Sequence, residues 1–143
     1  MDAGRAAARL LRREMSMAMV LISHDLGVVA ENCDRVAVMY AGRIVEQAPS
    51  NQLFADPVHP YAQGLIGALP PLDGPRRRLT AIPGTVPDPA QMPSGCAFAP
   101  RCALAVEPCN LAAPSLAPIA QDRTVACIRA EASRHALLGI AAE

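Results

Sequence analysis

The chain has 143 residues, 52% of them hydrophobic, which is enough apolar material for one small domain with a core. Its 13 basic and 13 acidic residues cancel, so the overall charge does not indicate nucleic-acid or anionic-membrane binding. No apolar run approaches the roughly 20 residues of a membrane-spanning helix. Because no export signal is recognisable, we expect a cytoplasmic protein, where cysteines bind metals more often than they form disulfides.

The N-terminal segment alternates helical and strand patterns. Apolar residues among the arginines of residues 1–14 have the spacing of an amphipathic helix. The mostly apolar run 17–23 predicts a strand that is buried on both faces. Asp25 is a suitable cap for a helix that extends to about Cys33.

A β-hairpin and two short helices are expected next. Residues 36–39 and 43–46 read as strands joined by a tight turn at Ala41-Gly42. Ser50 is expected to cap the first helix, with Leu53 and Phe54 on its buried side. A second helix is expected from about His59 to Leu69, where two prolines end it. The order of these elements predicts an α/β layer.

The remaining sequence, residues 70–127, is rich in proline and holds four of the five cysteines. This composition predicts an irregular extension whose loops are stiffened by proline. The basic run at residues 76–78 is expected to be a solvated loop.

His24 is the first candidate functional residue. It lies at the carboxyl end of the expected strand and just before a helix, the edge where α/β sheets bind ligands. A neutral imidazole donates one hydrogen bond and accepts another, which suits contact with a terminal phosphate and an attacking water. A surface histidine with an ordinary partner is the open alternative.

The second candidate site is a set of four cysteines with the spacing C-x5-C-x6-C-x17-C, namely Cys96, Cys102, Cys109 and Cys127. Four thiolates can complete an all-cysteine site for zinc or for an iron–sulfur cluster. Unlinked buried cysteines are the alternative. Cys33 stands apart and is expected to be a small buried residue.

Longer strings of sequence resemble ABC transporter ATPases. Residues 20–30 and 34–46 are similar to the switch-histidine region of that family, and Phe54-Ala55-Asp56-Pro57 with His59-Pro60-Tyr61 resembles its oligopeptide/dipeptide importer branch. The resemblance covers about residues 17–127. It implies that residues 1–69 are the C-terminal fragment of a nucleotide-binding domain, and that His24 senses the γ-phosphate.

The cysteine segment resembles the C-terminal extension of the same importers, which the resemblance places at residues 70–143. In that extension the four cysteines are associated with a [4Fe–4S] cluster, so the resemblance favours a cluster over zinc. It also implies a second ATPase subunit, two membrane permeases and a periplasmic binding protein as partners. The chain would then lie at the inner face of the cell membrane.

The departures from the family are equally informative. The sequence contains no phosphate loop, Gln loop, signature motif or apolar strand ending in paired carboxylates, and residues 2–5 do not clearly match the D-loop. We therefore expect a partial subunit, from a truncated gene, a mis-assigned start or a remnant. A stand-alone metal-binding module and a non-functional remnant are the alternatives, and the transported substrate stays open.

The 143-residue chain alone is predicted to release no phosphate from ATP. All 13 of its basic residues are arginine, so no lysine is available for the β- and γ-phosphates. Phosphate release is measured against a protein-free control, and turnover that a His24→Ala change removes would contradict the prediction.

Overall fold

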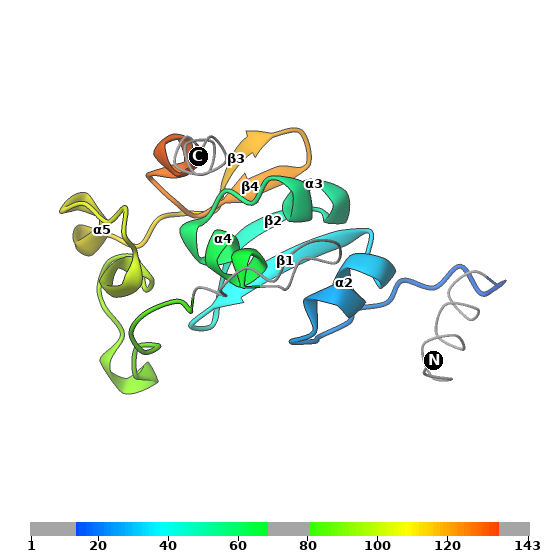
Figure 1. The fold of residues 1–143 in the computed structure, drawn as a ribbon, viewed down its shortest axis with the longest axis horizontal. Coiled ribbons are helices and arrows are strands. Elements are labelled where there is room, and N and C mark those ends of the chain that lie inside the picture. The colour runs from blue at the N-terminus through cyan, green and yellow to red at the C-terminus, as the bar shows by residue number, and fades with distance from the viewer. Residues whose placement is uncertain (1–13, 69–80, 135–143) are drawn as a thin grey trace, which may run out of the picture. The chain divides into compact units, whose positions relative to one another are not determined.

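The computed structural model describes residues 14–68 and 81–134 (Figure 1). The helix expected over residues 1–14 lies almost wholly outside these ranges, and the basic run at 76–78 lies outside them entirely. The chain divides into two compact units, Met1–Cys33 and Asp34–Glu143. Within the described ranges, no helix is long and apolar enough to cross a membrane.

In the first unit, the expected helix forms and the expected strand does not. Helix α2 (Leu26–Asn32) begins at Asp25, whose Oδ1 accepts a hydrogen bond from the Val28 N–H at 3.1 Å. Residues 17–23 form no strand, and the side chains of Val20 and Ile22 are 90% and 93% exposed. The strand prediction was wrong because such a strand needs pairing neighbours on both sides, which the described part of this unit does not supply.

The second unit begins with the hairpin that the sequence predicts. Strands β1 (Arg35–Tyr40) and β2 (Arg43–Pro49) pair antiparallel. Ala41 and Gly42 connect them with φ of 47° and 77°. Two successive left-handed residues match the twist of a hairpin, and glycine adopts that conformation without strain.

Two helices follow the hairpin, α3 (Ser50–Ala55) and α4 (Pro60–Gly67). The expected cap at Ser50 was wrong, because its side chain makes no capping bond and its backbone N–H instead donates to the Asp34 carbonyl at 2.9 Å. Leu53 is buried as expected, with 1% exposure. The start of α4 at His59 is also confirmed.

The proline-rich extension is more ordered than the sequence indicates. It contains η1 (Pro89–Gln91), η2 (Ala99–Arg101), α5 (Pro108–Leu111), β3 (Ala117–Ala120) and β4 (Arg123–Val125). Strand β4 pairs antiparallel with both β2 and β3, which gives one four-stranded antiparallel sheet in the order β1-β2-β4-β3. The expectation of an irregular extension was therefore wrong for β3 and β4, because strands of three and four residues are too short to produce a periodic pattern.

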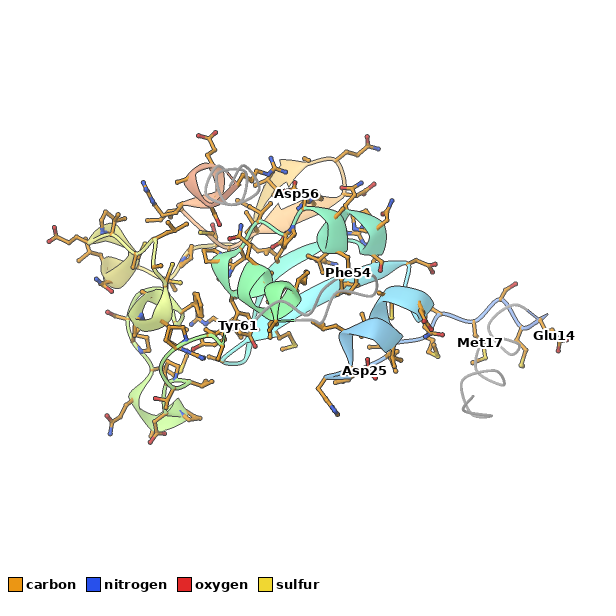
Figure 2. All side chains as sticks on the ribbon, viewed as in Figure 1. Glu14, Met17, Asp25, Phe54, Asp56 and Tyr61 are labelled. Carbon is orange, nitrogen blue, oxygen red and sulfur yellow. The ribbon has the colours of Figure 1, made fainter. Side chains whose placement is uncertain are left out.

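A buried ion pair holds the extension to the hairpin. Arg123 on β4 and Glu46 on β2 are 5% and 0% exposed, and Nη2 lies 3.2 Å from Oε1. Arg123 also donates to the Asp56 carbonyl oxygen at 2.6 Å, and Asp56 is labelled in Figure 2. Glu46 accepts the backbone N–H groups of Val58 and His59, the second at 2.7 Å.

The charge of Glu46 is the balance of two opposing effects. Burial raises the pKa of Glu46, because the carboxylate loses its contact with water. The backbone donors and the Arg123 guanidinium lower it, because they stabilise the ionised form. The backbone N–H groups of His59 and Val58 are the larger of the effects that favour the ionised form, and Arg123 adds to them.

Replacement of Arg123 by methionine is expected to reduce the free energy of unfolding by about 3–5 kcal/mol, because Glu46 is left buried without its counter-charge. Arg35→Met is the matched control. Arg35 pairs with Asp122 at 3.8 Å where both side chains are about half exposed, so its loss should cost under about 1 kcal/mol. Urea unfolding of both variants measures the difference, and equal effects would contradict the assignment.

Candidate functional site

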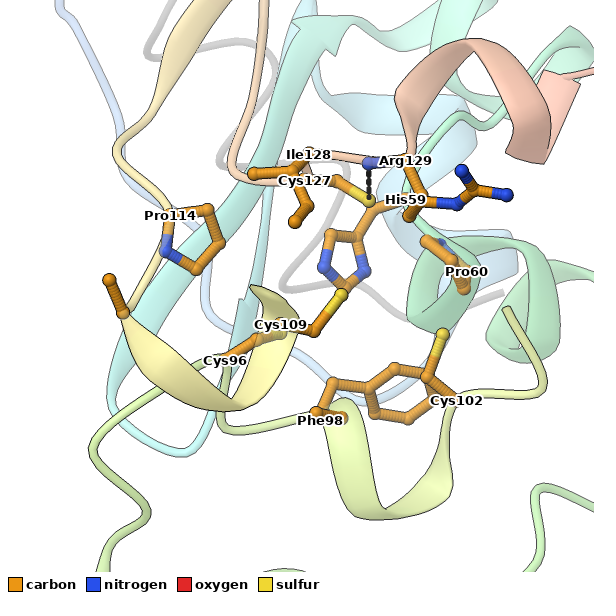
Figure 3. Close-up of a pocket in the computed structure, with 12 residues that line it drawn as sticks. His59, Pro60, Cys96, Phe98, Cys102, Cys109, Pro114, Cys127, Ile128 and Arg129 are labelled. Carbon is orange, nitrogen blue, oxygen red and sulfur yellow. Dashed lines mark hydrogen bonds between the residues drawn. The ribbon is translucent and has the colours of Figure 1, made fainter. Parts of the chain in front are cut away.

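The four cysteines of the predicted site line one small cavity in the second unit. The cavity has a volume of about 20 Å³, and its walls are mainly apolar (Figure 3). Its lining residues are His59, Pro60, Cys96, Phe98, Ala99, Cys102, Cys109, Ala112, Pro114, Cys127, Ile128 and Arg129. The cavity thus joins the start of α4 to three separate stretches of the extension.

Close backbone packing places Cys96 next to Cys109. The Cys96 N–H donates to the Cys109 carbonyl oxygen at 2.7 Å. This approach requires glycine at position 95, since a Cβ there would overlap the Cys109 carbonyl oxygen and would lie 2.6 Å from the Asn110 carbonyl carbon. The Gly95-Cys96 pair is therefore needed to bring the first and third cysteines together.

The other two cysteines are placed by neighbouring secondary structure. Cys102 ends η2, and its N–H donates to the Ala99 carbonyl at 3.2 Å. Cys127 follows β4, which is extended along β2 by a hydrogen bond from the Ala126 N–H to the Val45 carbonyl at 2.8 Å. The position of the fourth cysteine therefore depends on the sheet.

The thiols of Cys102 and Cys127 are held in the protonated form. Burial raises the pKa of Cys127 to about 11 and also raises the pKa of Cys102, and the neighbouring cysteines add to both effects. The Arg129 N–H donates to Cys127 Sγ at 3.3 Å, which partly opposes the effect of burial. A metal ion that binds these thiols must displace their protons.

His59 is a cavity residue that the sequence did not identify as part of a site. It is 1% exposed, and its Nδ1 accepts the Tyr61 N–H at 3.1 Å, which caps α4. Burial lowers the pKa of His59 to about 4, so the imidazole is neutral near pH 7. The sequence predicted a helix start at this residue, but no pattern indicated that the ring lines the same cavity as the cysteines.

The four thiols of the cavity are suitable ligands for a soft metal ion, but they are not arranged around a single metal position. Four thiols favour zinc or iron over magnesium and calcium. Within residues 14–68 and 81–134, no three His, Cys, Asp or Glu side chains are arranged to hold a metal ion. The cavity has about the volume that one water molecule needs.

The other candidates lie in the first unit. His24 is exposed and lies just before the Asp25 cap of α2, as expected, but the strand at 17–23, at whose carboxyl end it was predicted, is absent. Its contact with a phosphate stays a prediction. Cys33 is at the C-terminal cap of α2 and is half-buried rather than buried. It does not line the cavity.

Comparison with known proteins connects this chain to peptide transport. The family described as "Oligopeptide/dipeptide transporter, C-terminal region" matches residues 45–109. A protein of Brucella melitensis named as a peptide import ATP-binding protein is 54% identical over 101 residues, which is 71% of this chain and 30% of that protein. A peptide ABC transporter ATP-binding protein of Sinorhizobium fredii is 52% identical over 125 residues, 86% of this chain and 35% of its own length.

A third relative, a peptide import ATP-binding protein of Brucella ovis, is 50% identical over 125 residues. These residues make up 83% of this chain and 37% of the relative. The chain therefore spans about a third of the length of the relatives that it matches.

The metal-free chain is expected to lose stability as the pH falls from about 6.5 to about 4. His59 stays neutral in the folded state over this range, while the unfolded chain binds a proton below about pH 6.5, so acid favours unfolding. The loss approaches roughly 3 kcal/mol at the acid end. The raised pKa of Glu46 has the opposite effect and favours the folded state as the pH falls. The contribution of His59 is therefore measured by comparing urea unfolding of the wild type and of His59→Asn at each pH. Identical pH slopes would contradict the prediction.

Proposed function

The chain corresponds to the C-terminal region of oligopeptide/dipeptide ABC transporter ATP-binding proteins, and on this premise we propose that it is part of the ATP-binding subunit of a peptide importer. The observation that carries the proposal is the identity of 50% to 54% to three peptide-import ATP-binding proteins. Peptide is proposed as the cargo class on the same basis.

Within that subunit, we assign residues 1–69 to the nucleotide-binding domain and residues 70–143 to the importer-type extension. His24 is the proposed switch histidine, and its exposed position at the start of α2 leaves the imidazole available to a phosphate. ATP and Mg²⁺ binding requires a complete domain, since this chain has no lysine for the phosphates.

The proposed partners are a second ATPase subunit and the membrane permeases, with a periplasmic binding protein that delivers the peptide. The proposed location is cytoplasmic, at the inner face of the membrane and in contact with it through the permeases. Co-purification of the full chain with permeases supports this assembly, and recovery of the chain without any transporter subunit opposes it.

For the extension, we propose that Cys96, Cys102, Cys109 and Cys127 bind one metal group together. The supporting observation is that all four side chains line a single mainly apolar cavity. When bound, the group would supply the positive charge that four thiolates in a mainly apolar cavity need. The resemblance to importer extensions favours a [4Fe–4S] cluster, and the small volume of the cavity favours a single zinc ion.

The alternative function is a metal-binding module that acts without a transporter. The cavity alone supports it, because every residue that lines the cavity comes from the second unit. The two functions differ in whether the chain associates with permeases, and not in whether it binds a metal.

Anaerobically purified chain is expected to contain either iron with acid-labile sulfide and brown absorbance, or one zinc ion without colour. Changing the four cavity cysteines to serine should abolish metal content, because hydroxyl groups are poor ligands for soft metals. Cys33→Ser is the matched control and should retain the metal, since Cys33 does not line the cavity. Metal-free wild-type protein that folds as well as the four-serine variant would contradict the proposed site.

A further inference from the structure

The orientation of the His59 ring is fixed by hydrogen bonds at its own backbone and at Nδ1. The His59 N–H donates to Glu46 Oε2 at 2.7 Å, and the ring Nδ1 accepts the Tyr61 N–H at 3.1 Å. A neutral imidazole has one acceptor nitrogen and one N–H. Because Nδ1 is the acceptor, the proton is on Nε2.

The Nε2–H lies on the ring that lines the cysteine cavity (Figure 3). His59 is 1% exposed, so the ring is almost wholly enclosed by protein. Phe98 lies beside the ring with 5.9 Å between the centroids and offers no lone pair. Among the described residues, Nε2 forms no hydrogen bond, and the four cysteines share the cavity that the ring lines.

We propose that His59 is a positioning residue of the metal site, whose Nε2–H donates a hydrogen bond to a sulfur atom of the bound group. This inference rests on the proposed binding of a metal group by the four cysteines. A thiolate is a stronger acceptor than a thiol, so metal binding converts a weak acceptor into a good one at this position.

We do not assign His59 as a metal ligand, because its proton is on Nε2, the nitrogen that would have to bind the metal. A histidine that ligates through Nε2 carries its proton on Nδ1 and donates it to a carbonyl or carboxylate. Here Nδ1 faces the backbone N–H of Tyr61, so ligation through Nε2 would require either an imidazolate or the loss of the α4 cap. Donation to sulfur requires neither change.

The proposed hydrogen bond stabilises negative charge on the sulfur. In iron–sulfur sites, hydrogen bonds to sulfur are among the factors that set the reduction potential. In either kind of metal site, groups that orient the ligands are typically worth about 10–100-fold in metal affinity. Loss of this hydrogen bond is therefore expected to change both the affinity for the metal and the electronic spectrum of the bound metal.

Two substitutions separate the roles of the two ring nitrogens. His59→Asn keeps an acceptor for the Tyr61 N–H, because asparagine is a good helix cap, but its side chain is too short to present an N–H in the cavity. His59→Gln reaches further and places an amide N–H close to the position of Nε2. The pair thus distinguishes loss of the donor from loss of the cap.

The probe is Co²⁺ alone, added to the full 143-residue chain, because it takes the same thiolate ligands as zinc and has visible bands. His59→Asn is expected to lower Co²⁺ affinity by about 10–100-fold and to shift the thiolate-to-cobalt charge-transfer band. His59→Gln is expected to stay within about tenfold of the wild type, with the wild-type band position. Thermal unfolding of each variant checks that it is folded.

Each remaining outcome overturns the inference in a recognisable way. If His59→Asn binds Co²⁺ with wild-type affinity and spectrum, the donor role is wrong while the cysteine site stands. If folded His59→Gln binds as weakly as His59→Asn, the ring acts as a ligand or by packing and not as a donor. If wild-type protein binds no Co²⁺, the proposed metal site fails together with the inference.

Discussion

The buried pair between Arg123 and Glu46 is the interaction on which the second unit depends. Removal of two charges from water is costly, and the pair is tolerated because hydrogen bonds satisfy it on both sides. Glu46 accepts two backbone N–H groups from the segment before α4, and Arg123 donates to Asp56 at the end of α3. One carboxylate therefore connects β2, β4 and the α3–α4 connection, which come from different parts of the sequence.

The same pair determines the geometry of the cysteine cavity. The Glu46 carboxylate binds the backbone N–H of His59 and thereby places the imidazole on the cavity wall. Arg123 begins β4, and Cys127 follows the end of that strand by two residues. A charge network in the sheet thus positions two elements of the candidate site, although none of its charged side chains lines the cavity.

Local patterns in the sequence were sufficient to predict the elements that are stabilised by local contacts. The α2 cap, the Ala41-Gly42 turn and the helix after His59 depend on residues within four positions of each other. The strand at 17–23 failed because a strand requires partners. Strand β4 was missed because its pairing with the distant β2 makes it a strand, and β3 was missed because its partner is β4. The four cysteines were identified by residue type, whereas the placement of His59 beside them depends on a contact with Glu46, 13 residues earlier in the chain.

The charge balance of the cavity explains why hydrogen-bond donors would stabilise the sulfur ligands of a bound metal. Four thiolates carry four negative charges, and a divalent ion leaves two of them uncompensated within mainly apolar walls. The Arg129 N–H already donates to Cys127 Sγ, and the Arg129 guanidinium lowers the pKa of Cys102 against the effect of burial. The proposed His59 donor would add a further N–H group to those that Arg129 supplies. Because burial raises the pKa of Cys102 and of Cys127, deprotonation of these two thiols would be favourable only together with metal binding.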